Sequence, residues 1–105
     1  MFAADDVQVA AGQTALLPCH TTLSTPVTWR YKSPLQPIST VIFSDKSILP
    51  SLRDRYSVDS SVSGRYDLQI KQVSTSDSGT YNCTEDEGFG KVVYTGSLVV
   101  YGMLL

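Results

Sequence analysis

The sequence predicts an all-β fold, an antiparallel β-sandwich of about nine strands with Greek-key connections. Two patterns predict it: short runs in which apolar and polar residues alternate, and turn residues that interrupt these runs about every ten positions. No segment has a convincing helical period. The length of 105 residues suits one domain. We expect residues 1–105 to form that domain, with 103–105 as a remnant of whatever follows.

The expected strands can be placed in order along the chain. Alternation is clear at residues 7–9, and at 15–19, where Ala15, Leu17 and Cys19 share one face. It returns at residues 27–32, and a β-branched and aromatic run follows at 38–43. The remaining strands are expected at 55–58, 66–70, 80–84 and 92–101. Regular short strands of this kind are typical of a sandwich.

Composition excludes several classes of protein. Eight Lys and Arg are outnumbered by ten Asp and Glu, so the chain is not basic enough to follow a nucleic-acid backbone. No apolar run approaches the roughly 18 residues needed to cross a bilayer, so we expect no membrane insertion by this segment. A hydrophobic content of 42% is too high for a disordered chain. No signal peptide is visible, and we interpret Met1 as an added start on a mature sequence.

The two cysteines permit one intramolecular pairing, Cys19 with Cys83. A bridge that closes a loop of about 64 residues stabilises a fold by roughly 4 kcal/mol in the chain-entropy description. Such a bridge persists in an oxidising compartment, so it predicts an extracellular protein. The alternative is a pair of reduced, buried thiols.

Two aromatic residues stand where a bridged sandwich needs them. Trp29 follows Cys19 by ten residues, and its indole is expected to pack against the bridge. Tyr81 precedes Cys83 by two residues, and its hydroxyl is expected to bond back to the backbone at the corner before its strand. These residues predict the centre of the core.

The segment around the second cysteine contains the motif Asp-x-Gly-x-Tyr-x-Cys at residues 77–83, and Arg55 is the expected partner of Asp77. With this motif and with Cys19 and Trp29, the sequence resembles the immunoglobulin superfamily, and the resemblance extends over nearly the whole chain. The stretch from Trp29 to Arg55 has room for two extra edge strands, so the resemblance is to the variable (V) set. The Phe-Gly-x-Gly motif of rearranged antigen receptors is missing from the last strand, which implies a non-rearranging receptor or adhesion domain.

Catalysis, metal binding and cofactors find no support in the motifs. His20 is the single histidine, and we interpret it as a solvated residue at a strand end, because no motif supplies a nucleophile or an orienting acid. With both cysteines in a bridge, no metal-ligand spacing remains. Gly88-x-Gly90 lacks the third glycine and the following helix of a phosphate loop. We therefore expect a protein that is not an enzyme.

Alternation also predicts a binding face. If the core signature points inward, the outward residues on the same sheet are Arg30, Lys32, Asn82 and Thr84. The resemblance implies that this face, made by strands G, F, C and C′, pairs with other proteins. One phase of the run at 38–43, either Phe43 or an isoleucine pair, should add apolar side chains to it. The alternative is a solvated face with scattered apolar residues.

A second candidate is the connection at residues 85–90, where Glu85, Asp86 and Glu87 precede Phe89 between two glycines. An exposed aromatic gains free energy when a partner covers it. The acids could meet the basic strand of a second copy across a two-fold axis, or a basic patch on a different protein. Asn82-Cys83-Thr84 is also a glycosylation sequon. We expect Asn82 to be unmodified, because a glycan there would sit on the binding face.

The sequence therefore predicts an extracellular recognition domain of a cell-surface or secreted protein. Its expected partner is a second copy of itself or another cell-surface protein. One alternative is a structural spacer module in a multi-domain chain. Another is an intracellular module, which would have free thiols.

Overall fold

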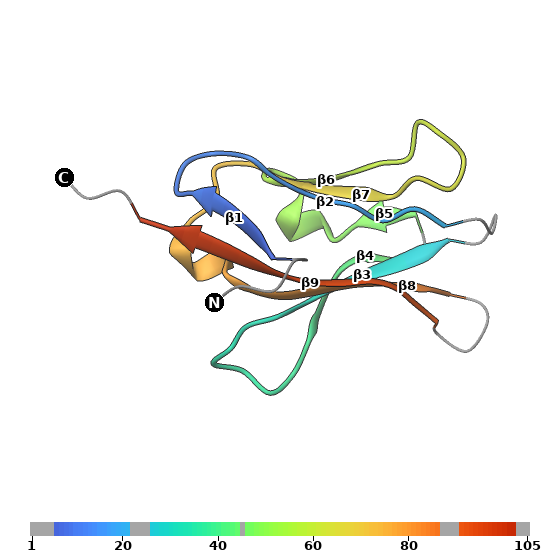
Figure 1. Cartoon of the computed structure of the whole chain (residues 1–105). Helices are drawn as coiled ribbons and strands as arrows, with labels where there is room; N and C mark the ends of the chain where they lie inside the picture. The colour runs from blue at the N-terminus through green and yellow to red at the C-terminus, as the bar shows by residue number, and fades with distance from the viewer. Residues whose placement is uncertain (1–5, 22–25, 45, 87–90, 103–105) are drawn as a thin grey trace.

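The computed structural model describes residues 6–21, 26–44, 46–86 and 91–102, which form a sandwich of two sheets (Figure 1). One sheet has six strands in the order β1-β9-β8-β3-β4-β5, and the other has three in the order β2-β7-β6. The expected all-β sandwich is confirmed. The strands are β1 (Val7–Ala10), β2 (Ala15–Leu17), β3 (Val27–Lys32), β4 (Thr40–Ser44), β5 (Ser47–Ile48), β6 (Tyr56–Asp59), β7 (Asp67–Ile70), β8 (Gly79–Glu85) and β9 (Val92–Tyr101).

All strand pairings between these elements are antiparallel except that of β1 with β9, which is parallel. Two short 3-10 helices, η1 (Pro50–Leu52) and η2 (Thr75–Asp77), lie in the connections. Beyond β3, the six-stranded sheet continues into β4 and the two-residue strand β5. These are the two extra edge strands that the long stretch after Trp29 predicts.

The predicted alternation places the core between the two sheets. In β2, Ala15 and Leu17 are fully buried, whereas Leu16 between them is 60% exposed. In β7, Leu68 and Ile70 are fully buried in the same manner. Burying apolar side chains of this size contributes roughly 1.5–3 kcal/mol each. The buried apolar residues are Ala15, Leu17, Cys19, Val27, Trp29, Ile42, Phe43, Tyr56, Leu68, Ile70, Val73, Tyr81, Cys83, Leu98 and Val100.

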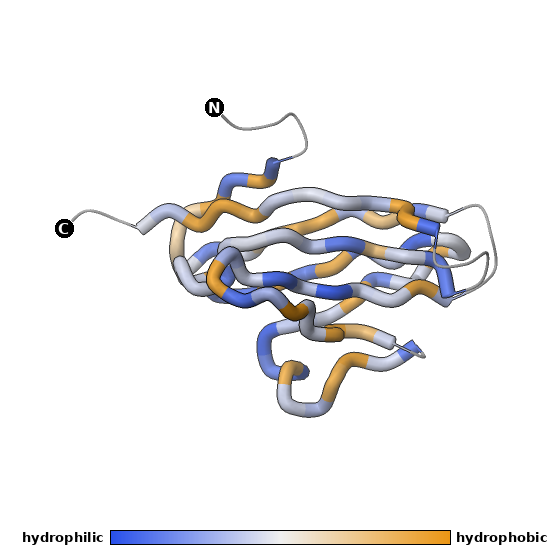
Figure 2. Tube along the Cα trace, turned by 90° about the horizontal axis from the view of Figure 1, so that it is seen from below, coloured by the Kyte–Doolittle hydropathy of each residue, from blue (hydrophilic) through white to orange (hydrophobic). Residues whose placement is uncertain are grey.

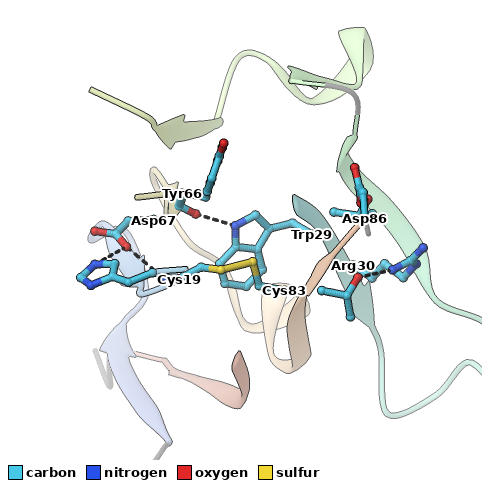
Figure 3. Close-up of a disulfide and its surroundings, with 10 residues drawn as sticks. Cys19, Trp29, Arg30, Tyr66, Asp67, Cys83 and Asp86 are labelled. Carbon is cyan, nitrogen blue, oxygen red and sulfur yellow. Dashed lines mark hydrogen bonds and ion pairs between the residues drawn. A yellow bond between two sulfur atoms is a disulfide. The ribbon is translucent and has the colours of Figure 1, made fainter. Parts of the chain in front are cut away.

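A disulfide between Cys19 and Cys83 joins the two layers at the centre of this core, with the indole of Trp29 beside it (Figure 3). Trp29 is fully buried, and its Nε1 donates a hydrogen bond of 2.7 Å to the carbonyl oxygen of Tyr66. The Tyr94 ring meets the indole edge-on, with ring centroids 5.8 Å apart. The predicted pairing and the predicted place of Trp29 are confirmed, and the alternative of two free thiols does not hold.

Tyr81, Arg55 and Asp77, which the sequence predicts to act together, fix the corner of the chain before β8. The Tyr81 hydroxyl donates to the carbonyl oxygen of Asp77 at 2.7 Å. The Arg55 guanidinium contacts both carboxylate oxygens of Asp77, at 2.8 and 3.0 Å. That carboxylate also accepts the backbone N–H of Ser74 at 2.9 Å, which caps η2. The roles predicted for Tyr81, Arg55 and Asp77 are confirmed.

Gly79 at the start of β8 is required by close packing. A Cβ atom at this position would lie 2.5 Å from the carbonyl oxygen of Lys32 and 2.7 Å from the Tyr31 ring. Because one of these neighbours is backbone, a larger residue would push β8 away from β3. The glycine thus keeps the two central strands of the six-stranded sheet in register at Lys32 and Thr80.

Candidate protein-binding face

Backbone pairing arranges the outward side chains of β4, β3, β8 and β9 in rows across the six-stranded sheet. Directly paired residues share a face of the sheet. We call the three rows together the outer face; Figure 2 views the molecule from this side. They are Val41–Arg30–Asn82–Thr95 in the middle, Lys32–Thr80–Ser97 toward the start of β8, and Thr28–Thr84–Val92 toward its end.

The structure brings three of the predicted binding residues together in the outer face. Arg30 is half-buried, and its Nη1 donates to the Thr84 hydroxyl at 2.9 Å (Figure 3). Asn82 pairs directly with Arg30, and its Oδ1 is buried with no hydrogen-bond partner. The centre of the outer face is therefore polar, and the hydrogen bond to Thr84 holds the Arg30 side chain in place. That Asn82 carries no glycan stays a prediction.

Lys32 and Asp86 mark opposite ends of the outer face. Lys32 is the exposed last residue of β3. Asp86 is exposed beyond the end of β8, where its backbone N–H donates to Pro26 at 3.0 Å and its Oδ1 accepts the Thr28 hydroxyl. Pro26 precedes Lys32 by six residues, which corresponds to about 20 Å along a strand. One end of the face thus carries a cation and the other an anion.

The prediction that Glu85 is an exposed loop acid is wrong. Glu85 is the last residue of β8 and is only 3% exposed. Pairing continues one residue further than the sequence predicts, because the Glu85 N–H donates to Lys91 across the hairpin at 2.8 Å. Glu85 therefore keeps the inward phase of Tyr81 and Cys83. Glu87 and Phe89 lie outside the described residues.

The prediction of an exposed Phe43 or isoleucine pair on this face is also wrong in part. Trp29 pairs with Phe43 and Arg30 with Val41, so Ile42 is the extra residue of a β-bulge. The bulge buries both Ile42 and Phe43, which are 2% and 5% exposed. Of the apolar residues of β4, only Val41 therefore lies on the outer face, and it is half-buried.

Sequence alternation missed exposed Leu35 in the turn between β3 and β4, and it placed Ile38 in a strand although Ile38 lies in this turn. Leu35 is 88% exposed and Ile38 is 77% exposed. The turn projects away from the second sheet (teal in Figure 1), and a shallow hollow of about 270 Å³ between Pro34 and Val99 lies at its foot. The signal was present in the sequence, since a leucine between Pro34 and Pro37 is unsuited to a paired strand.

His20 lies three residues beyond the end of β2, where it forms an isolated β-bridge with Arg65. Its side chain is 62% exposed, and Nε2 is 3.0 Å from the Asp67 carboxylate. It is thus solvent-exposed, as predicted, but it lies beyond the end of β2 and has an acidic neighbour. Among the described residues there is no group of three His, Cys, Asp or Glu that could hold a metal ion. The part of the chain that the structure describes also contains no helix long and apolar enough to cross a membrane.

The sandwich, its central disulfide and the corner tyrosine agree with a comparison of the sequence with family models. The model of the immunoglobulin V-set domain matches residues 3–101. The chain belongs to the immunoglobulin V-set family. Domains of this family are typically non-enzymatic recognition modules, and a V-set domain with a disulfide is typical of extracellular proteins. In the family's strand lettering, β3, β4, β8 and β9 are C, C′, F and G.

Solved structures of similar shape include other immunoglobulin domains. The ZIG-8–RIG-5 IG1–IG1 heterodimer has a TM-score of 0.72 at 18% identity, with 94% of this chain and 83% of that chain covered. The ZIG-8 IG1 homodimer gives 0.72 at 20% identity, with 94% and 80% covered. Murine CRIg gives 0.70 at 21% identity, with 96% and 97% covered. A search of curated protein sequences found no match. At these identities the likeness establishes the fold alone.

Proposed function

We propose that this V-set domain is the protein-recognition part of an extracellular receptor or adhesion protein of the non-rearranging type. In this proposal two copies pair through the outer face, and the turn between β8 and β9 takes part. The observation that carries the proposal is the separation of charge along the face, with Lys32 at one end and Asp86 at the other.

In a dimer with a two-fold axis, the separation of charge along the outer face makes the two copies electrostatically complementary. In a symmetric dimer the same patch meets its own copy, so an axis through the middle row reverses the direction of the strands. Lys32 of one copy then lies toward Asp86 of the other, twice in each dimer. Matching charges of this kind favour one orientation and one partner more than they add affinity.

Apolar side chains around the outer face supply the remaining driving force. Leu35 and Ile38 on the projecting turn and Val92 at the other end of the face are all more than half exposed. Stable interfaces have apolar anchors and a polar rim, and covering these side chains removes apolar surface from water. The hollow beside Pro34 is a place where an apolar side chain of the partner can be received.

Sedimentation equilibrium over a concentration series tests the proposal. We expect wild type to associate reversibly. Thr95→Arg places a bulky charge in the middle row and should weaken association at least about tenfold, which corresponds to roughly 1.4 kcal/mol. Ser57→Arg is the matched control, since Ser57 is an exposed strand residue on the three-stranded sheet, and should leave association unchanged.

Two results would count against pairing through the outer face. One is a wild type that stays monomeric at the highest concentration reached. The other is an equal loss of association in Thr95→Arg and Ser57→Arg. Circular dichroism of both variants should show the wild-type fold, because neither position is buried.

A further inference from the structure

Glu85 is a buried acid, and one oxygen of its carboxylate has no hydrogen-bond partner among the described residues. The residue is 3% exposed, and its Oε2 is closed to solvent without a hydrogen bond. Its backbone N–H is occupied by the hairpin bond to Lys91. A buried carboxylate without a compensating donor is unfavourable by several kcal/mol in general. Such a group calls for a donor from elsewhere.

The chain's own cations do not provide that donor. All eight lysines and arginines lie within the described residues. Arg55 contacts Asp77, and Arg65 contacts Asp59 and Asp67. No ion pair between described residues includes Glu85. His20 and Lys91 line the same cavity as Glu85 without an ion pair to it, so we expect the neutralising cation to come from another molecule.

Glu85 lines a cavity of about 240 Å³ at the end of the sandwich where β8 passes into β9. Pockets for drug-sized ligands have about 300–1,000 Å³, so this cavity suits one side chain better than a whole small molecule. Its lining offers an acid for a charged head group and valine side chains for an alkyl stem. The lining residues are His20, Thr21, Glu85, Lys91, Val92 and Val93.

We propose that this cavity receives an arginine or lysine side chain presented by a partner protein. The head group donates to the Glu85 carboxylate, and the methylene stem lies along Val92 and Val93. A charge-assisted hydrogen bond in a half-enclosed site is stronger than an exposed ion pair. Glu85 faces the interior side of β8, so the charged part of this site lies apart from the outer face, to which only Val92 among the lining residues belongs.

Titration of the ¹⁵N-labelled domain with N-acetyl-L-argininamide tests the proposal. We expect saturable shifts at the backbone amides of Glu85, Lys91, Val92 and Val93, with a Kd of about 1–10 mM, as suits a single side chain. The citrulline analogue has the same shape without the charge, and it should bind at least about tenfold more weakly. Glu85→Gln should remove the shifts, while Asp54→Asn, which removes an exposed acid elsewhere, should keep them.

Glu85→Gln keeps the size of the side chain and removes a buried charge, so the variant is expected to fold. Equal binding of the arginine and citrulline probes, or unchanged binding by Glu85→Gln, would overturn the proposal. Binding by Lys91→Gln but not by wild type would also overturn it, because Lys91 itself would then fill the site. Tighter binding of free L-arginine than of the blocked amide, by about tenfold, would indicate a small-molecule site instead.

Discussion

Replacing Asp77 by alanine is expected to lower the free energy of unfolding by about 2–4 kcal/mol. The substitution removes both contacts to Arg55 and leaves the Ser74 N–H without its acceptor. The expected loss is below that of a fully enclosed ion pair, because the Arg55 side chain is 36% exposed. Urea denaturation followed by tryptophan fluorescence measures it, since Trp29 is the single tryptophan and is fully buried.

Asp59→Ala is the matched control for this substitution. Asp59 approaches Arg65 at 3.9 Å, and its side chain is 48% exposed. Exposed ion pairs contribute about 0–1 kcal/mol, so this variant should lose little. Equal losses in the two variants would contradict the assignment of Asp77 as the residue that fixes the corner of the sandwich.

The pH dependence of unfolding gives a second readout of Asp77. Burial acts to raise the pKa of this carboxyl, but hydrogen bonds from Arg55 and from the Ser74 N–H outweigh it and hold the pKa below its usual range. The folded state therefore favours the ionised form. This contribution to stability is complete above about pH 4, which is the pKa of an aspartate in the unfolded chain. It is lost as the pH falls through the lower pKa that Asp77 has in the folded state. Wild type should lose more stability than Asp77→Asn between about pH 4 and pH 2.

Removing the disulfide is the second large effect. Cys19→Ala/Cys83→Ala is expected to lower the free energy of unfolding by about 4 kcal/mol, because the bridge spans 64 residues of sequence. Domains of this size have about 5–15 kcal/mol in total, so the variant should be close to unfolding at 37 °C. Equilibrium denaturation of the oxidised wild type and the double variant measures the difference.

Reduction of the wild type by dithiothreitol provides an independent control for the double variant. It should give a loss of similar size without any change of sequence. A loss below about 1 kcal/mol in both cases would mean that the sandwich does not depend on its bridge. Thiol titration of the native protein should find no free thiol, because both cysteines form the disulfide.

The sequence was sufficient for the parts of the fold that local pattern determines. The two-residue period fixes which side of a strand faces inward, so Trp29, Tyr81 and Cys83 could be placed without a structure. The partnership of Arg55 and Asp77 could be predicted from the motif that contains Asp77. The residues between these inward-facing ones must face outward, so the sequence also predicts that Arg30, Asn82 and Thr84 lie on one face.

The errors come from features that depend on pairing between distant segments. The bulge in β4 appears only when that strand is laid against β3, and it turns both Ile42 and Phe43 inward. Likewise, the end of β8 is set by its bond to Lys91 across the hairpin, so Glu85 is in the strand and buried. A single sequence shows the alternation of each strand but not the register between two of them.

These corrections sharpen the electrostatic account of the outer face. With Glu85 inside, Asp86 is the one described acid of the predicted trio that is exposed. Arg30 is engaged with Thr84, which leaves Lys32 as the exposed cation at the other end. The proposed pairing therefore depends on two residues of opposite charge about 20 Å apart along the strands.

A mixing experiment tests that pairing most directly. Lys32→Glu and Asp86→Lys each place like charges opposite one another in a two-fold dimer, so each variant alone should associate more weakly than wild type. An equimolar mixture restores opposite charges at both contacts of a mixed dimer. Sedimentation velocity should then show association close to that of wild type. A mixture that stays as weakly associated as its two components would contradict the proposed dimer.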